Sequence, residues 1–414
     1  MLNIRINMKK YILGSLAAAS LILGGCSNGE EFNDAVFITG TLTTNTIRVA
    51  VDGVSHTAFT VTSSAKAASD IKIEVAAAPE LLDEYNKKNQ RNFQVPPVDA
   101  YTLEDGIVTI KSGSNVSSQA SLVTDGDKLA EGISYCLPIT IKEISGAGLD
   151  IMESSRTAYV MFTKVINIKA ANLARRGGFN VPQFWEVNNP NSPVKALGEM
   201  TLEMKVLPVA FGTNPRNGND ISSLCGCEEN FLFRFGDGAG QPTNQLQLAP
   251  GKIGTDPSDP NKNPNYGFKV TDKLFETGHW LHFAAVYDGS TLKIYLDGEQ
   301  IYNVNTKGGI VNLSRAYDGH TWEDGFSIGR SAGYARYFNG YISECRVWNV
   351  ARTLDELNAG ICYVDPTTDG LVAYWRFNGE TQDANGTVRD ETGHGYDAVP
   401  FGSVTYVDNQ KCPY

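Results

Sequence analysis

The stretch WLHFAAVYDGSTLKIYLDG, residues 280–298, decides the fold of the second half of the chain. It holds two runs of aromatic and branched residues, and each run ends in an Asp-Gly pair, at 288–289 and 297–298. Asp-Gly favours a tight reversal because glycine adopts positive φ without a Cβ clash. In the run 292–296 apolar residues alternate with others, which is the period of a strand with one buried face. The stretch therefore predicts an antiparallel meander.

Further short strands are expected on both sides of this meander. Residues 200–206 alternate four apolar residues with Thr201, Glu203 and Lys205, which predicts a half-buried strand whose polar face is formed by these three side chains. Strands are also expected at 231–237, 244–248 and 371–377, and polar surface loops rich in turn residues at 211–222, 237–243 and 250–266.

The segment FNGYISECRVW, residues 338–348, predicts another strand. Strand periodicity places Glu344 and Arg346 on one face, together with Ile342 and Trp348. The carboxylate and the guanidinium are two residues apart, so we expect a same-face ion pair with a structural role. A helix should follow at 351–357, where Thr353 and Glu356 have the spacing of a capping box.

These segments together resemble one known family. Residues 338–348 are similar to the F-x-G-x-I-x-E-x-R-[VI]-W strand of laminin-G-like, concanavalin A-like domains, and residues 280–298 and 370–398 fit the same family. The resemblance covers about three-fifths of the chain and implies a jelly roll. It also implies glycan or protein binding, and a calcium site built from loop carboxylates and backbone oxygens.

Length and charge limit the remaining possibilities. A chain of 414 residues exceeds what one hydrophobic core usually holds, so two domains are expected. The formal net charge is −11 at pH 7, and no stripe of Lys and Arg exists that could neutralise phosphates. Nucleic acid is therefore not an expected partner.

The N-terminus carries a targeting signal. Lys9 and Lys10 precede an apolar run, residues 11–23, that is too short to span a membrane as a helix. The run ends in Leu-Gly-Gly-Cys, which resembles a bacterial lipoprotein signal and implies cleavage before Cys26 and acylation of its thiol. Glu30 and Glu31 follow, similar to the export signal of Bacteroidetes surface lipoproteins. We therefore expect an outer-membrane lipoprotein that is exposed at the cell surface.

The next segment, about 35–165, predicts a small β-sandwich. Its short apolar runs are separated by Gly, Asn, Ser and Asp, and one helix begins at Pro79. The order of EYNKKN, VPPVDAYTLEDGIVTIKSG and LAEGISYCLPITI resembles an N-terminal domain of unknown function in Bacteroidetes surface lipoproteins of glycan-utilisation loci. The resemblance implies an Ig-like fold, and we expect a spacer that lifts the next domain from the membrane.

The predicted fold class is all-β. An Ig-like β-sandwich is followed by a concanavalin A-like (laminin-G-like) jelly roll, and Gly177-Gly178 is expected to form a hinge or turn near the boundary. The expected parts are a signal peptide at 1–25, a linker at 26–34, the sandwich at 35–168 and the jelly roll at 169–414.

The signatures of common enzymes are missing from the sequence. It has no nucleotide P-loop, no His-Glu-x-x-His, and no Glu-x-Asp-x-x-Glu of jelly-roll glycosidases. His279 and His282 are three apart, which sends them to opposite faces of a strand, so they cannot form a metal pair there. No catalytic residue is predicted.

Six cysteines remain after Cys26, and an exported chain can oxidise them. Six thiols allow 15 pairings. The favoured pair is Cys362 with Cys412, which would tie the C-terminal tail to the domain. Cys225 and Cys227 are too close in sequence for an unstrained bridge to each other.

Two loops, residues 317–324 and 334–337, combine aromatic rings with carboxylates or a guanidinium, which is the chemistry that sugar sites use. A third candidate, Tyr266, lies in the loop at 250–266. Calcium, if bound, would use oxygens of Asp237, Asp256 and Asp324. The candidate ligand contacts are Tyr317, Asp318, Trp322, Tyr334, Arg336, Tyr337 and Tyr266.

The sequence thus predicts a surface lipoprotein whose jelly roll captures a polysaccharide or host glycan, alongside a SusC/SusD-type uptake system. Two alternatives remain open at this point. One is a glycoside hydrolase with an unrecognised carboxylate pair, and the other is an adhesin that binds protein.

Overall fold

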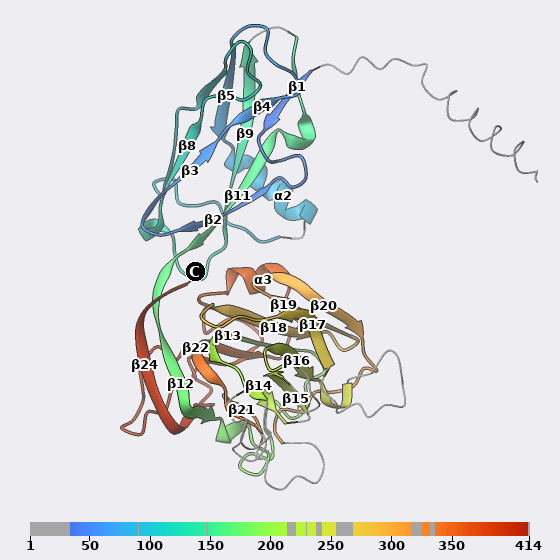
Figure 1. Ribbon diagram of the computed structural model, residues 1–414, viewed down its shortest axis with the longest axis vertical. Coiled ribbons are helices and arrows are strands. Elements are labelled where there is room, and N and C mark those ends of the chain that lie inside the picture. Colours follow the sequence, from blue (N-terminus) through green and yellow to red (C-terminus); the bar gives the residue numbers. More distant parts are fainter. Residues whose placement is uncertain are drawn as a thin grey trace, which may run out of the picture.

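The computed structural model describes residues 34–89, 91–145, 148–212, 221–228, 230–236, 242–253, 268–315, 325–331 and 336–412. These residues form two domains, one above the other in Figure 1, with the C-terminus at the junction between them. In the described part of the chain, no helix has the length and apolar character needed to cross a membrane.

The N-terminal domain is a β-sandwich with a small core. Its strands form a five-stranded sheet in the order β2-β11-β9-β5-β7 and two three-stranded sheets, β10-β1-β4 and β3-β8-β6. Alternate residues of β9 and β11, such as Leu137, Ile139 and Val160, point into this core. The strands are β1 Ala35–Ile38, β2 Thr46–Val51, β3 Val54–Phe59, β4 Val61–Ser63, β5 Ile71–Ala77, β6 Tyr101–Glu104, β7 Ile107–Ile110, β8 Ala120–Asp125, β9 Tyr135–Ser145, β10 Asp150–Ile151 and β11 Thr157–Lys164.

The predicted helix lies on the outer face of the five-stranded sheet. It begins as the 3-10 helix η1, Pro79–Leu81, and continues as α2, Leu82–Asn89. Leu82 and Tyr85 pack against Cys136 on β9. Proline at the start, acidic residues in the first turn and lysines in the last turn suit the helix dipole.

The C-terminal domain is the predicted jelly roll. Its strands form one continuous ladder, β17-β16-β15-β14-β21-β12-β22-β13-β18-β19-β20, while β23 pairs with β22 and β24 with β12. Since β12 pairs with both β21 and β22, it joins the two layers of the sandwich. The strands are β12 Ile166–Asn180, β13 Met200–Ala210, β14 Ser222–Cys227, β15 Phe231–Phe235, β16 Gln245–Ala249, β17 Phe268–Leu274, β18 Leu281–Tyr287, β19 Thr291–Leu296, β20 Glu299–Asn305, β21 Ser327–Ile328, β22 Asn339–Trp348, β23 Leu371–Trp375 and β24 Val399–Cys412.

The meander at 280–298 is confirmed. Strands β18, β19 and β20 are consecutive antiparallel neighbours. Asp297 and Gly298 have φ of 49° and 77°, as a tight hairpin turn between β19 and β20 requires. Leu292, Ile294 and Leu296 face the main core. The capping box is confirmed too, since Thr353 and Glu356 begin helix α3, Leu354–Ala359.

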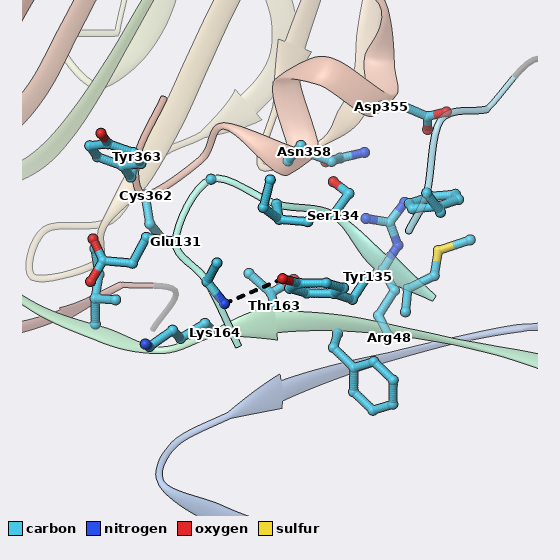
Figure 2. Close-up of a pocket in the computed structure, with 18 residues that line it drawn as sticks. Arg48, Glu131, Ser134, Tyr135, Thr163, Lys164, Asp355, Asn358, Cys362 and Tyr363 are labelled. Carbon is cyan, nitrogen blue, oxygen red and sulfur yellow. Dashed lines mark hydrogen bonds between the residues drawn. The ribbon is translucent and has the colours of Figure 1, made fainter. Parts of the chain in front are cut away.

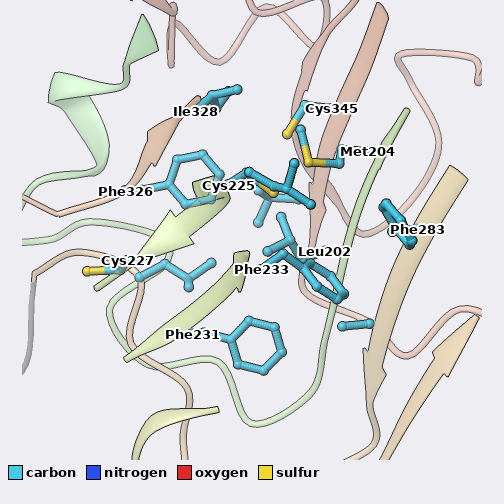
Figure 3. Packing of buried hydrophobic residues seen from close by; sticks show 14 of the residues in the cluster. Leu202, Met204, Cys225, Cys227, Phe231, Phe233, Phe283, Phe326, Ile328 and Cys345 are labelled. Carbon is cyan, nitrogen blue, oxygen red and sulfur yellow. The ribbon is translucent and has the colours of Figure 1, made fainter. Parts of the chain in front are cut away.

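Large aromatic and sulfur-containing side chains fill the core between the two layers. Phe233 on β15 meets Phe283 on β18 with ring centroids 6.1 Å apart. Figure 3 shows Met204 and Cys345 from one layer directed toward Cys225 from the other. This core is separate from the core of the N-terminal domain.

Three expectations are wrong. Thr201, Glu203 and Lys205 on β13 are buried, because α3 and the segment after β22 cover that face of the sheet. Ile342 lies in the main core with Cys345 and Val347, because a register shift in β22 between residues 342 and 344 reverses the alternation there.

Gly177 and Gly178 are the third correction. They form no hinge, but lie inside β12, where β24 approaches so closely that a Cβ on Gly177 would be 2.3 Å from the carbonyl oxygen of Ser403. Glycine is needed here for close backbone packing.

The domain junction contains the disulfide that the sequence favoured. Cys362, after α3, is bonded to Cys412 at the end of β24, with the Cα atoms 5.5 Å apart. Arg91 forms an ion pair with Asp355, and Lys411 with Asp52, so each pair joins the two domains. Figure 2 shows the cavity of about 50 Å³ that remains between them, lined from both sides.

We expect replacement of both Cys362 and Cys412 by Ser to lower the free energy of unfolding by about 2–4 kcal/mol, because the crosslink restricts the unfolded chain. Urea unfolding of the oxidised protein and of the double variant measures this difference. Reductant should destabilise the natural protein and leave the variant unchanged. Equal stability of the two oxidised proteins would contradict the expectation.

Candidate functional site

Two of the predicted ligand contacts, Arg336 and Tyr337, lie within the described residues. They precede β22 at the end of the jelly roll that is opposite the domain junction, because Tyr337 contacts Phe401 near the start of β24. The other predicted ligand contacts, the predicted calcium ligands and the lipidation site lie outside the described residues: Tyr266, Tyr317, Asp318, Trp322, Tyr334, Asp237, Asp256, Asp324 and Cys26.

Arg336 is held by a buried carboxylate. Its Nη1 donates a hydrogen bond of 2.8 Å to Oε1 of Glu228, and Nη1 of Arg234 lies 3.9 Å from the same oxygen. Glu228 is 5% exposed, whereas the side chain of Arg336 is 29% exposed. The backbone carbonyl of Arg336 also accepts from the Ser223 N–H. The guanidinium is therefore fixed in position and still open to solvent.

Tyr337 lies between a cation and a second ring. The guanidinium of Arg176 is 5.8 Å from the centre of its ring, and the ring of Phe401 is 6.4 Å away. Arg330 stacks on Phe401 at 4.4 Å and donates a 2.6 Å hydrogen bond to Asn180. Two neighbouring rings thus lie between two guanidiniums along this edge, where the end of β12 pairs with the start of β24. We call Arg336 and Tyr337, with these neighbours, the rim site.

A polar row supports the rim site from the sheet. Ser223, Arg234 and Gln247 are direct cross-strand partners on β14, β15 and β16, and all three are buried. The residues beside them in each strand point into the main core. This row is not among the predicted site residues, although SSLC, FLFRF and QLQL show the alternation. Its identification requires the strand register.

Comparisons with known proteins agree with this architecture. A family model described as the concanavalin A-like lectin/glucanases superfamily matches residues 190–358. The C-terminal domain is a concanavalin A-like domain. A second family model, which describes an N-terminal domain, matches residues 31–148.

Solved structures include one relative that spans nearly the whole chain. A proposed carbohydrate-binding protein from Bacteroides ovatus is 24% identical, with a TM-score of 0.50, over 91% of this chain and 98% of that chain. EndoBT-3987 from Bacteroides thetaiotamicron, solved with Man5GlcNAc product, is 20% identical over 31% of this chain and 30% of that chain, with a TM-score of 0.26.

Domain 4 of AbnA, a GH43 extracellular arabinanase from Geobacillus stearothermophilus solved with arabinotriose, is 19% identical over 40% of this chain and 67% of that chain, with a TM-score of 0.27. Among the curated proteins, none matches the chain.

The concanavalin A-like domain also contains a buried charge cluster, on the face of β13 and β22 that α3 covers. Glu203 accepts hydrogen bonds from Trp348 Nε1 at 2.8 Å and pairs with His282 Nε2 at 2.9 Å. Arg346 bridges Glu203, at 3.4 Å, and Glu344, at 2.7 Å. The expected Glu344–Arg346 pair is therefore confirmed, and His282 has a structural partner.

Burial and charge oppose each other in this cluster. Burial alone would raise the pKa of Glu203, but Arg346 and the hydrogen bond with His282 lower it to about 2. Burial dominates at Glu344, whose pKa is raised despite Arg346. Burial also lowers the pKa of Lys205 to about 8. Both carboxylates are 2% exposed, so substrate cannot reach this pair.

Metal ligands are sparse where the structure can be described. No group of three or more His, Cys, Asp or Glu side chains suited to a metal ion occurs among those residues. His279 is exposed, and its Nε2 lies 3.8 Å from a carboxylate oxygen of Glu276. The calcium expectation rests on Asp237, Asp256 and Asp324 and stays a prediction.

We expect Glu203→Gln to lower the free energy of unfolding at pH 7 by about 3 kcal/mol, because Arg346 loses one of its buried counter-charges. The folded-state pKa of Glu203 is depressed, so its stabilisation is present above about 4.5 and is lost as the pH falls toward about 2. The variant should lose less stability across this window.

Urea unfolding at pH 7 and pH 3 measures both effects. Glu299→Gln, at an exposed position on β20, is the matched control and should behave like the natural protein. An unchanged acid dependence in Glu203→Gln would show that this carboxylate does not carry the effect.

Proposed function

We propose that this protein is a surface lipoprotein that binds glycan through the rim site of its concanavalin A-like domain. The observation that carries the proposal is the pair of half-buried side chains Arg336 and Tyr337, which contact Glu228 and Phe401 at the end of the sandwich opposite the domain junction. The Bacteroides ovatus relative, a proposed carbohydrate-binding protein, supports it.

The chemistry of the rim site suits a sugar. A sugar ring presents C–H groups to an aromatic face and hydroxyl groups to charged or amide side chains. Tyr337 supplies the ring, and Arg336 supplies fixed N–H donors with little conformational entropy left to lose on binding. Ligand contacts from Tyr266, Tyr317, Asp318, Trp322 and Tyr334 are part of the proposal.

The proposed location follows from the N-terminal segment. Acylated Cys26 would hold the protein at the outer membrane, and the N-terminal sandwich would act as a spacer. Strand β12 continues outward from the junction, and the 13 residues from Ile166 to Gly178 span roughly 40 Å. Glycan captured at the rim site would then be passed to a SusC/SusD-type uptake system.

Binding without catalysis is the favoured form of this proposal. Glycoside hydrolysis requires two carboxyl groups that reach the substrate. Glu203 and Glu344, the carboxylates that Arg346 brings together, are closed to substrate. Glu228 is engaged by Arg336 and lies beneath the rim site.

We expect Arg336→Ala and Trp322→Ala each to weaken glycan binding by about tenfold, because each removes one of the few anchoring contacts. An array of plant and host glycans, probed with the purified protein, measures this. Arg389→Ala, an exposed arginine of the same domain, is the matched control. Unchanged binding in both variants would contradict the proposed site.

The same preparation separates the alternatives. Release of oligosaccharide from any arrayed glycan would favour a glycoside hydrolase. Binding to host proteins after their glycans are removed would favour an adhesin.

We expect calcium to bind the concanavalin A-like domain through oxygens that include Asp237, Asp256 and Asp324. Calorimetry of calcium added to EDTA-treated protein should show heat, and replacement of Asp324 by Asn should reduce it. Addition of magnesium is the control. Magnesium should bind more weakly than calcium, because it demands shorter metal–oxygen distances and a stricter octahedral geometry. Absence of heat would remove calcium from the proposal.

A further inference from the structure

The N-terminal domain has a groove of its own, remote from the rim site. Its volume is about 470 Å³, within the range of roughly 300–1,000 Å³ that is typical of ligand sites. One wall is α2, and the floor is the outer face of β9 and β11, where α2 lies beside these strands in Figure 1. Nothing in the proposed function of the concanavalin A-like domain uses this groove.

The groove exists because α2 is too short to cover the sheet. Tyr85 on the helix stacks on Tyr159 of β11, with ring centroids 3.9 Å apart, and this contact closes one side. Farther along the strands, Thr140 and Thr157 are direct cross-strand partners on the same outer face. Their hydroxyl groups lie 2.8 Å apart on the floor of the groove.

The lining is polar and carries charges of both signs, with three cationic and two anionic side chains. Nine of the twelve lining residues are Asn, Thr, Lys, Arg or Glu. Lys142 and Arg156 are already paired with Glu80 and Glu153. Asn45 and Lys88 both line the groove, and their side chains make no hydrogen bond or ion pair with described residues. The groove therefore offers unused donors and acceptors without a strong field of either sign.

These features exclude two classes of ligand. A lipid chain would require an apolar lining, but a single aliphatic residue, Leu81, borders the groove. An extended peptide would add to a free strand edge. Here β11 is paired on both sides by β2 and β9, and β9 by β11 and β5, so no backbone edge is open.

We propose that this groove binds a neutral oligosaccharide and is a second carbohydrate site of the protein. Amides and hydroxyl groups meet the hydroxyl edges of sugar residues, and the half-buried ring of Tyr159 offers an aromatic surface to their C–H faces. The site is independent of the rim site and stands or falls separately from it.

The test is calorimetric titration of the full-length protein with maltohexaose, cellohexaose, xylohexaose and mannohexaose. Four variants accompany the natural protein. The groove variant combines Asn45→Ala with Lys88→Ala, the rim variant combines Arg336→Ala with Tyr337→Ala, and a combined variant carries all four changes. The control is Lys87→Ala, which removes the neighbouring exposed lysine of α2 that does not line the groove. Thermal unfolding confirms that each variant is folded.

At least one hexasaccharide should bind the rim variant, and the groove changes made in that background should weaken this binding about tenfold. Lys87→Ala should bind as the natural protein does. The inference is overturned if no hexasaccharide binds the rim variant, or if the groove changes leave its binding unchanged. Loss of binding in the rim variant alone would support the proposed function and refute this second site.

Discussion

The architecture of the C-terminal domain depends on the neutralisation of charges between two neighbouring central strands. Burial of a single carboxylate is costly unless opposite charge and hydrogen bonds accompany it. Glu203 on β13 and Glu344 on β22 both form ion pairs with Arg346. His282 and Trp348 form hydrogen bonds with Glu203. This arrangement lets α3 cover a polar face of the sheet, and the jelly roll is therefore closed on the side nearest the N-terminal domain. Its opposite end carries the rim site.

The sequence predicts the elements whose causes are local. The Asp-Gly pairs at 288–289 and 297–298 set the meander, and the capping box of Thr353 starts α3, because a few adjacent residues determine each of them. The polar face of β13 is buried, contrary to the sequence-based expectation, because distant segments of the chain cover it. Alternation reports two chemically different faces, but it does not report whether a distant segment covers the polar one.

The candidate site is less predictable than the fold. Loop composition singled out Arg336 and Tyr337, yet it could not identify Glu228, which lies 108 residues earlier in the chain. The polar row of Ser223, Arg234 and Gln247 depends on the register of three strands. A one-residue shift in the pairing of β22 with β13 places Ile342 in the core, and no local feature of FNGYISECRVW predicts this shift. Contacts between distant segments thus set the geometry of the site.

The pairing of β12 with β24 has a mechanical consequence. The two strands run antiparallel from the junction, where Ile166 is opposite Cys412, to the far end, where Asn180 is opposite Val399 (Figure 1). A tether at the N-terminal domain and a load at the far end would pull along these strands, so their hydrogen bonds would be sheared together instead of opened one at a time. The bond between Cys362 and Cys412 anchors the end of β24 where that force enters. A load applied along these two strands would therefore act on many backbone hydrogen bonds at once.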